Sequence, residues 1–263
     1  MIKAGIIGCG NVGLLWDKPK DMNFNTHAKS YSRHPKVTLK AGCDIKFNRA
    51  RALQGMYRGV MPYRDYKTML AREDLDVVSV CTDTESHYKV LKHIIRETGI
   101  KYILAEKPLA SDFEKAREIN LLARENNVHV SVNYLRRWDK TVARVKEAVH
   151  RESLGRLILG SFVYYGTFKN NGIHFLDLLD FFGEDVRFER LLSKAGKTED
   201  DFAASLLLRT RDGAPVYFHN IDRKYITHLG VDLFYENGRV RLSDWGSAEI
   251  FKAKGSSSFP KLK

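Results

Sequence analysis

The chain has 263 residues, of which 43% are hydrophobic and 29% are charged. This composition is ordinary for a globular protein and excludes collagen-like and largely disordered classes, and the length allows one large domain or two smaller ones. No apolar run approaches the roughly 18 residues of a membrane span, and a strand-like segment follows Met1 without a signal peptide. We therefore expect a cytoplasmic protein with no membrane partner.

The formal net charge of +12 is spread over both halves of the chain, without a basic tail or a block of like charges. Such a distribution is typical of a solvated basic surface and does not favour a nucleic-acid partner. It does favour an anionic small substrate. The cysteines Cys9, Cys43 and Cys81 lack the spacing of metal ligands, so we expect reduced thiols and no metal site.

The first half of the chain alternates short apolar strands with amphipathic helices. Strands are predicted at 4–7, 37–41, 77–81, 102–105 and 128–132, and helices at 87–97 and at 112–126, where Asp112 is a good N-cap. This alternation is typical of βαβ units. It predicts an α/β fold with a doubly wound parallel sheet.

After residue 132 the pattern changes. Helices are predicted at 140–150 and 173–182, and strands within 156–168 and at 203–210, 215–221, 231–235 and 240–242. Turn signals at 211–213 and 236–238 separate the later strands and predict hairpins of an open, mainly antiparallel sheet. We therefore predict two domains, 1–132 of Rossmann type and 133–263 of α+β type, with a frayed tail at 255–263.

A GxGxxG motif follows the first predicted strand. In this setting the first glycine permits a tight turn, the second lets a pyrophosphate approach the backbone, and the next helix N-terminus favours its charge. The motif predicts a dinucleotide site built on Gly8, Gly10, Asn11, Val12 and Gly13. Asp44 follows the second strand, where a carboxylate can bind the adenosine ribose and so favours NAD, although Lys46 and Arg49 keep NADP possible.

Asp44 lies 31 residues beyond Gly13, further than the roughly 20 residues usual after this motif. Residues 14–25 therefore look like an insertion before a helix expected at 27–34. Two interpretations stay open for it, a surface loop and a flap over cofactor or substrate.

Five elements, in chain order, resemble the glucose–fructose oxidoreductase/inositol dehydrogenase/rhizopine-catabolism (Gfo/Idh/MocA) family over essentially the whole chain. They are the glycine motif, Cys43-Asp44, Val80-Cys81-Thr82 with His87, Glu106-Lys107-Pro108, and Gly172-Ile173-His174-Phe175-Leu176-Asp177. The resemblance implies an NAD(P)-binding domain at 1–132, with a Lys-Pro bond that is cis in many members. It also implies a substrate-binding domain at 133–263, whose open sheet covers the active site and often mediates homo-oligomer contacts.

Lys107 follows the fifth strand at its carboxyl end, where open α/β sheets bind ligands, and its ammonium can stabilise a developing alkoxide. Glu106 is expected to fix the aim of Lys107. His174 and Asp177 share a helix face, so the carboxylate can fix the imidazole tautomer for acid–base catalysis. We predict that Lys107 and His174 serve one substrate hydroxyl.

The family's enzymes typically have an Asp four residues before this histidine, and here that position is Asn170. An amide can bind a hydroxyl but cannot take its proton, so the base must be His174 or Lys107. Thr82 and His87 are expected beside the nicotinamide half of the cofactor, although Asp83 stands where the family usually has Pro.

For Arg136 and Arg137, an anion clamp and a surface role stay equally open. The leading interpretation of the chain is an NAD(P)-dependent oxidoreductase acting on a secondary alcohol of a sugar, cyclitol or nucleotide-sugar. Asn171-Gly172, directly before Ile173 and His174, resembles the sequence at this position in family members of surface-polysaccharide and nucleotide-sugar pathways. The alternative is a non-enzymatic dinucleotide or sugar sensor, which Asn170 and the short second domain favour.

Overall fold

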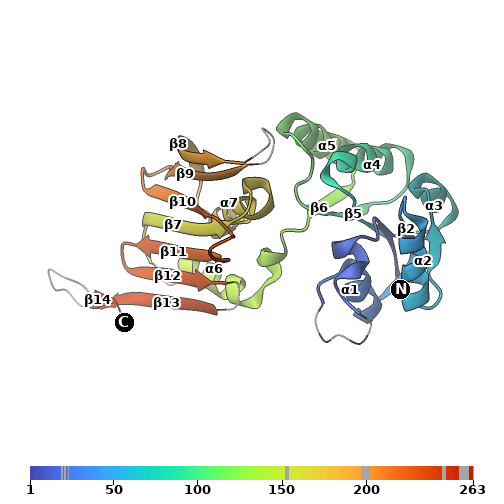
Figure 1. Cartoon of the computed structure of the whole chain (residues 1–263), viewed down its shortest axis with the longest axis horizontal. Helices are drawn as coiled ribbons and strands as arrows, with labels where there is room; N and C mark the ends of the chain where they lie inside the picture. Colours follow the sequence, from blue (N-terminus) through green and yellow to red (C-terminus); the bar gives the residue numbers. More distant parts are fainter. Residues whose placement is uncertain are drawn as a thin grey trace. The chain divides into compact units, whose positions relative to one another are not determined.

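The computed structural model describes residues 1–18, 20, 22, 24–151, 154–196, 202–244, 247–254 and 261–262. The chain divides into two units, Met1–Asn133 and Tyr134–Lys263, each with a sheet and a core of its own (Figure 1). None of the helices described is both long and apolar enough to cross a bilayer.

The described part of the first unit contains one six-stranded parallel sheet in the order β3-β2-β1-β4-β5-β6. Its strands are β1 (Ile2–Ile7), β2 (Val37–Cys43), β3 (Met61–Tyr63), β4 (Val77–Val80), β5 (Tyr102–Ala105) and β6 (His129–Val132). The strand order reverses between β1 and β4, which is the point where open α/β sheets bind ligands. The predicted doubly wound fold is confirmed.

Helices connect these strands, namely α1 (His27–Arg33), α2 (Phe47–Met56), α3 (Tyr66–Arg72), α4 (Thr84–Glu97) and α5 (Phe113–Glu125). Asp112 caps α5 as predicted, accepting a hydrogen bond from the Lys115 N–H at 2.9 Å. α4 begins three residues earlier than predicted because the Asp83 carboxylate caps it through the Ser86 N–H. The predicted strands were all found, whereas α2, α3 and the three-residue β3 were not foreseen.

The strands described in the second unit form a sheet in the order β14-β13-β12-β11-β7-β10-β9-β8, antiparallel except for the parallel pair β7 and β10. They are β7 (Leu157–Tyr165), β8 (Val186–Ala195), β9 (Ala203–Thr210), β10 (Pro215–Ile221), β11 (Gly230–Tyr235), β12 (Gly238–Ser243), β13 (Ser247–Lys254) and β14 (Lys261–Leu262). The expected α+β fold is confirmed. Most of the predicted frayed tail lies outside the described residues, but its described part, β14, pairs with β13 and is a strand.

Two helices, α6 (Lys140–Arg151) and α7 (Ile173–Phe182), contribute to the core of the second unit. Phe175 of α7 packs against Phe162 of β7 and Phe218 of β10, with ring centroids 5.1 and 6.2 Å away in tilted and edge-to-face arrangements. The apolar face of α7 points inward as predicted, since Phe175, Leu178, Leu179 and Phe182 are almost completely buried. This packing fixes the helix that begins next to His174.

Candidate functional site

The glycine motif forms the turn between β1 and a single π-helical turn, Asn11–Leu15. Gly8 has a φ of +96°, and a Cβ there would lie 2.5 Å from the Cys81 carbonyl oxygen. A Cβ on Gly13 would lie 2.1 Å from the Gly8 carbonyl oxygen, whereas one on Gly10 would meet only the Arg49 side chain, at 3.8 Å. The protein's own backbone therefore requires Gly8 and Gly13, while Gly10 leaves open space against the turn where a pyrophosphate can approach.

Asp44 is buried at the carboxyl end of β2 and is tied to the same turn. One carboxylate oxygen accepts the Cys9 N–H at 2.9 Å, and the other accepts the Lys46 N–H at 2.8 Å. Each carboxylate oxygen can accept more than one hydrogen bond. The side chain is therefore held in place and keeps acceptor capacity for a ribose.

A pocket of about 700 Å³ opens at the carboxyl ends of β1, β2 and β4, a size usual for small-molecule sites. Four of the predicted cofactor residues line it, namely Gly8, Gly10, Asp44 and Thr82. Its rim carries both signs of charge, from Lys46, Arg49, Arg64 and Lys89 and from Asp65, Asp83 and Glu85. The arrangement fits the adenosine half of a dinucleotide.

Within the insertion, the chain after the π-helical turn is held by hydrogen bonds between Asp17 and Asn25. The buried Asp17 carboxylate accepts hydrogen bonds from the Asn25 N–H at 2.7 Å and from the Asn25 Nδ2 at 2.8 Å. The Lys29 Nζ donates to the Lys18 carbonyl at 2.9 Å. Pro19, Asp21 and Asn23 lie outside the described residues, so the flap interpretation stays a prediction.

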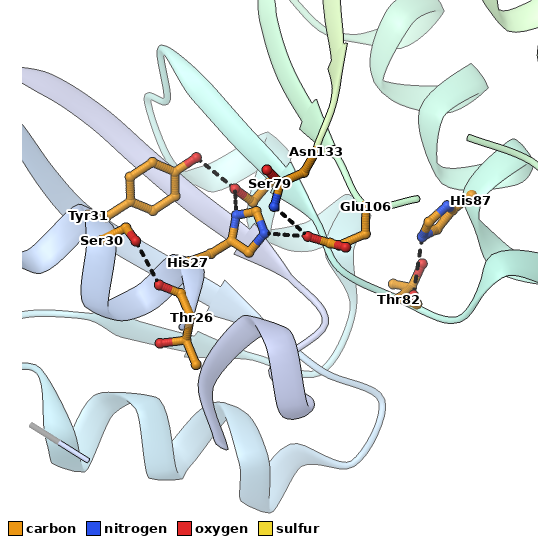
Figure 2. Close-up of polar contacts among 9 residues, drawn as sticks. All are labelled: Thr26, His27, Ser30, Tyr31, Ser79, Thr82, His87, Glu106 and Asn133. Atoms are coloured by element: carbon orange, nitrogen blue, oxygen red, sulfur yellow. Dashed lines mark hydrogen bonds and ion pairs between the residues drawn. The ribbon is translucent and has the colours of Figure 1, made fainter. Parts of the chain in front are cut away.

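Glu106, directly after β5, is the acceptor of a buried polar network (Figure 2). Its Oε1 lies 2.9 Å from the His27 Nε2 and 2.8 Å from the Asn133 Nδ2. The other ring nitrogen of His27 lies 2.8 Å from the Ser79 hydroxyl, which in turn lies 2.6 Å from the Tyr31 hydroxyl. Burial alone would raise the pKa of Glu106, but hydrogen bonds from His27 and Asn133 hold it below its ordinary value.

Lys107 follows this network and is half-buried, with a cis peptide bond to Pro108. His87, expected beside the nicotinamide half of the cofactor, is almost completely buried, and the residues that line the pocket do not include it. Its two ring nitrogens lie 2.9 Å from the Pro108 carbonyl oxygen and 3.1 Å from the Thr82 carbonyl oxygen. His87 thus joins the loops that follow β4 and β5.

In the second unit, His174 lies in the first turn of α7, with its ring edge-on to Tyr134 at 5.9 Å between centroids. Asn170 is exposed in the π-helical turn just before it. The Asp177 carboxylate, expected beside the imidazole, accepts hydrogen bonds from the Arg137 Nε at 2.9 and 3.0 Å. Sequence spacing put Asp177 and His174 on one face but could not foresee this cation.

Arg137 also binds Asp180 at 2.6 Å, and its guanidinium lies 5.3 Å from the centre of the Phe181 ring. The hydrogen bonds to Asp177 raise the pKa of Arg137 above its ordinary value. Arg137 therefore forms an ion pair within the second unit, a role that neither of the two open interpretations had included. For Arg136 burial lowers the pKa, and neither role is decided.

The three cysteines are free thiols, and burial raises the pKa of Cys43 to about 12. They are therefore protonated near neutral pH and poor nucleophiles. Sequence reasoning missed the polar network around Glu106, which includes His27, Ser79, Tyr31 and Asn133. His27 was not predicted, because the insertion separates it in the sequence from the glycine motif.

Residues 2–134 match the family model described as "Oxidoreductase family, NAD-binding Rossmann fold". The chain belongs to the Gfo/Idh/MocA family. Membership confirms the resemblance seen in the sequence and the cofactor class, NAD or NADP, that the glycine motif predicts.

Two curated relatives show which members of the Gfo/Idh/MocA family this chain is similar to. Inositol 2-dehydrogenase of Rhizobium meliloti is 25% identical over 243 residues, which cover 84% of this chain and 69% of that protein. D-glucoside 3-dehydrogenase of Escherichia coli is 30% identical over 156 residues, covering 59% of this chain and 41% of that protein. The matched part of the chain therefore covers 41% of one of these relatives and 69% of the other.

Among solved structures, KijD10, a 3-ketoreductase of Actinomadura kijaniata in complex with NADP and TDP-benzene, has a TM-score of 0.80. The match is 17% identical and covers 99% of this chain and 84% of that one. At this identity it shows the shared Gfo/Idh/MocA fold.

Proposed function

We propose that the chain is an NAD(P)-dependent oxidoreductase that transfers a hydride between a nicotinamide cofactor and a secondary alcohol of a sugar, cyclitol or nucleotide-sugar. This proposal rests on the position of Lys107, just after the carboxyl end of β5. In the same sheet the strand order reverses between β1 and β4, and the glycine turn lies at this reversal. Two relatives are named as dehydrogenases of an inositol and a glucoside, which supports a substrate rich in hydroxyl groups.

The cofactor would be held by the glycine turn, by Asp44 and by Thr82. The fit rests on the open space at Gly10 and on the spare acceptor capacity of the fixed Asp44 carboxylate. A 2′-phosphate would meet like charge at Asp44, which favours NAD, while Lys46 and Arg49 in the same pocket keep NADP possible. When bound, the nicotinamide accepts or supplies the hydride.

The chain's own residues would handle the proton. In the oxidation direction, the Lys107 ammonium holds the substrate hydroxyl and stabilises the developing alkoxide, and His174 takes the hydroxyl proton. Asn170 can orient a neighbouring hydroxyl but cannot act as a base. In the reduction direction, the same groups return the proton to the carbonyl oxygen.

The net charge of +12 supports an anionic substrate, such as a nucleotide-sugar of a surface-polysaccharide pathway. The free thiols and the pyridine-nucleotide cofactor support a cytoplasmic location. We propose that residues 1–132 bind the cofactor and residues 133–263 bind the substrate.

We also propose a homo-oligomer formed through the second sheet. β8, the described strand at one edge of that sheet, leaves Phe188, Leu191 and Leu192 at 64%, 45% and 45% exposed. Edge strands with exposed apolar side chains are ready to pair with another chain. Light scattering of the purified protein tests this assembly.

Asn170 supports the alternative, a sensor that binds dinucleotide and sugar without turning them over. The test of the proposed function titrates NADH and NADPH by fluorescence and then measures turnover with inositols, glucosides and nucleotide-sugars. Oxidoreduction of one of these classes supports the enzyme. Tight binding of cofactor and sugar, with no turnover of any class, supports the sensor.

A further inference from the structure

We propose that His27 is a positioning residue for Lys107, acting through Glu106. This inference rests on the proposed function, because it gives Lys107 a task whose geometry matters. It also makes a claim about the unliganded protein, since the His27 contact exists without any ligand.

Two hydrogen bonds fix the Glu106 side chain. Two donors from different elements converge on the same oxygen, the His27 Nε2 at 2.9 Å from α1 and the Asn133 Nδ2 at 2.8 Å from the residue after β6. Two hydrogen bonds to this oxygen oppose both rotation and withdrawal of the carboxylate. The backbone of Glu106 is held as well, by a bond from its N–H to the Val80 carbonyl at 2.9 Å.

His27 is itself fixed, by burial and by its contact with Ser79. The residue is 6% exposed, and its Nδ1 contacts the hydroxyl of Ser79, which is completely buried within β4. Because an ionised carboxylate only accepts hydrogen bonds, the His27 Nε2 must carry the proton that faces Glu106. Ser79 and Tyr31 complete the chain of contacts behind the ring, so that the orientation of His27 has support on both sides (Figure 2).

Glu106 is linked in turn to Lys107. It precedes Lys107 directly, and the Lys107 backbone N–H helps to lower the pKa of Glu106. The groups around this carboxylate are His27 from α1, Asn133 after β6, Cys81 after β4 and Lys107 itself. A shift of the carboxylate therefore reaches the backbone from which the Lys107 side chain starts.

The test compares three variants with the wild type. His27→Leu removes both ring nitrogens and keeps an apolar side chain of similar bulk. His27→Gln keeps an N–H donor that can reach Glu106. Tyr31→Phe is the matched control, because it removes the far hydroxyl of the network and leaves the contact between His27 and Glu106.

Two measurements are made on each variant after its thermal unfolding has shown that it folds. The first is kcat, KM and the Kd of NADH. The second is the labelling rate of Lys107 by an amine reagent in the free protein, followed by mass spectrometry. The second measurement does not need turnover, and a structural role of His27 alone would not move it.

We expect His27→Leu to lower kcat about tenfold or more, since small displacements of an active-site group have effects of up to about 10²-fold. We also expect it to change the labelling rate of Lys107 while leaving the Kd of NADH within about twofold. His27→Gln should recover most of both effects, and Tyr31→Phe should resemble the wild type.

An unchanged labelling rate of Lys107 in a folded His27→Leu variant would overturn the inference, whatever happens to kcat. A change in labelling without turnover of any substrate class would instead leave the positioning intact and remove the proposed oxidoreductase function. If His27→Leu does not fold, the comparison of His27→Gln with Asn133→Leu replaces it, with the larger labelling change expected for Asn133→Leu.

Discussion

The imidazole of His27 and the carboxylate of Glu106 meet at 2.9 Å although 79 positions separate them in the chain. The contact joins α1, which follows the insertion, to the end of β5, which precedes Lys107. The contact therefore links the helix that follows the unusual insertion to Lys107, the lysine on which the proposed chemistry depends.

The Glu106 network should contribute to stability in a pH-dependent way. Hydrogen bonds hold the pKa of Glu106 below its ordinary value in the folded protein, so its stabilisation is present above the unfolded pKa, roughly 4.3, and is lost as the pH falls through the folded pKa. Glu106→Gln should therefore lower the free energy of unfolding by about 1–3 kcal/mol at pH 7, and by less near pH 3. Urea denaturation across this range measures it. A deficit that grows toward low pH would contradict the assignment.

Cofactor choice should depend on Asp44. The wild type should bind NADH more tightly than NADPH, and Asp44→Ala should narrow this gap because the ribose loses its acceptor and a 2′-phosphate no longer meets a carboxylate. Asp44→Asn is the control that keeps the side-chain shape and one oxygen. Fluorescence titration of the three proteins with both cofactors gives six dissociation constants. Tighter binding of NADPH by the wild type would instead point to Lys46 or Arg49 as a phosphate clamp.

Lys107→Met and His174→Asn should each lower the rate of hydride transfer by roughly 10²-fold or more, the usual scale for acid–base and alkoxide-stabilising groups. Neither group is assigned to the pyrophosphate, so the Kd of NADH should stay close to that of the wild type. Stopped-flow measurement of nicotinamide absorbance separates the two quantities. Loss of cofactor binding in either variant would assign that residue to the cofactor site.

Asn170→Asp distinguishes two histories of the site. If a base has been lost at this position, the carboxylate should raise turnover, and the new activity should fall as the pH is lowered and the aspartate is protonated. If His174 or Lys107 already serves as the base, the rate should not change. Asn171→Asp is the control, because it adds the same charge one residue away.

The ion pair of Arg137 and Asp177 should be structural. Arg137→Met leaves the buried Asp177 carboxylate without its cation, which typically costs about 3 kcal/mol. The double variant Arg137→Met/Asp177→Leu should recover most of this loss. Arg156→Met, which breaks an exposed pair with Glu236, should have a much smaller effect. Equal losses in the two single arginine variants would contradict a special role for Arg137.

The sequence was most informative where apolar periodicity is strong. The buried strands and α7 were predicted within a few residues, because their side chains face a core on one side or both. β8 was not foreseen, since nine of its ten residues are exposed and backbone pairing with β9 holds it in place. The three-residue β3 is too short to show a pattern.

The candidate site divides in the same way. Residues in local sequence contexts could be named before the structure, Gly8 from the glycine motif and Asp44 from its place after the second predicted strand. The partners of Glu106 and Asp177 could not, because His27 and Arg137 come from other elements and tertiary structure alone brings them into contact. Their identity depends on packing, which no short pattern encodes.

The Asp17 carboxylate closes the insertion at its base by binding Asn25 through two hydrogen bonds. These bonds fix the chain just before Thr26, the N-cap of α1, and join the two residues that flank residues 18–24. We expect this segment to accept a grafted peptide or an affinity tag while the glycine turn and His27 keep their positions. Residues 18–24 are thus a place where the protein could be given a new recognition element, provided that Asp17 and Asn25 are kept.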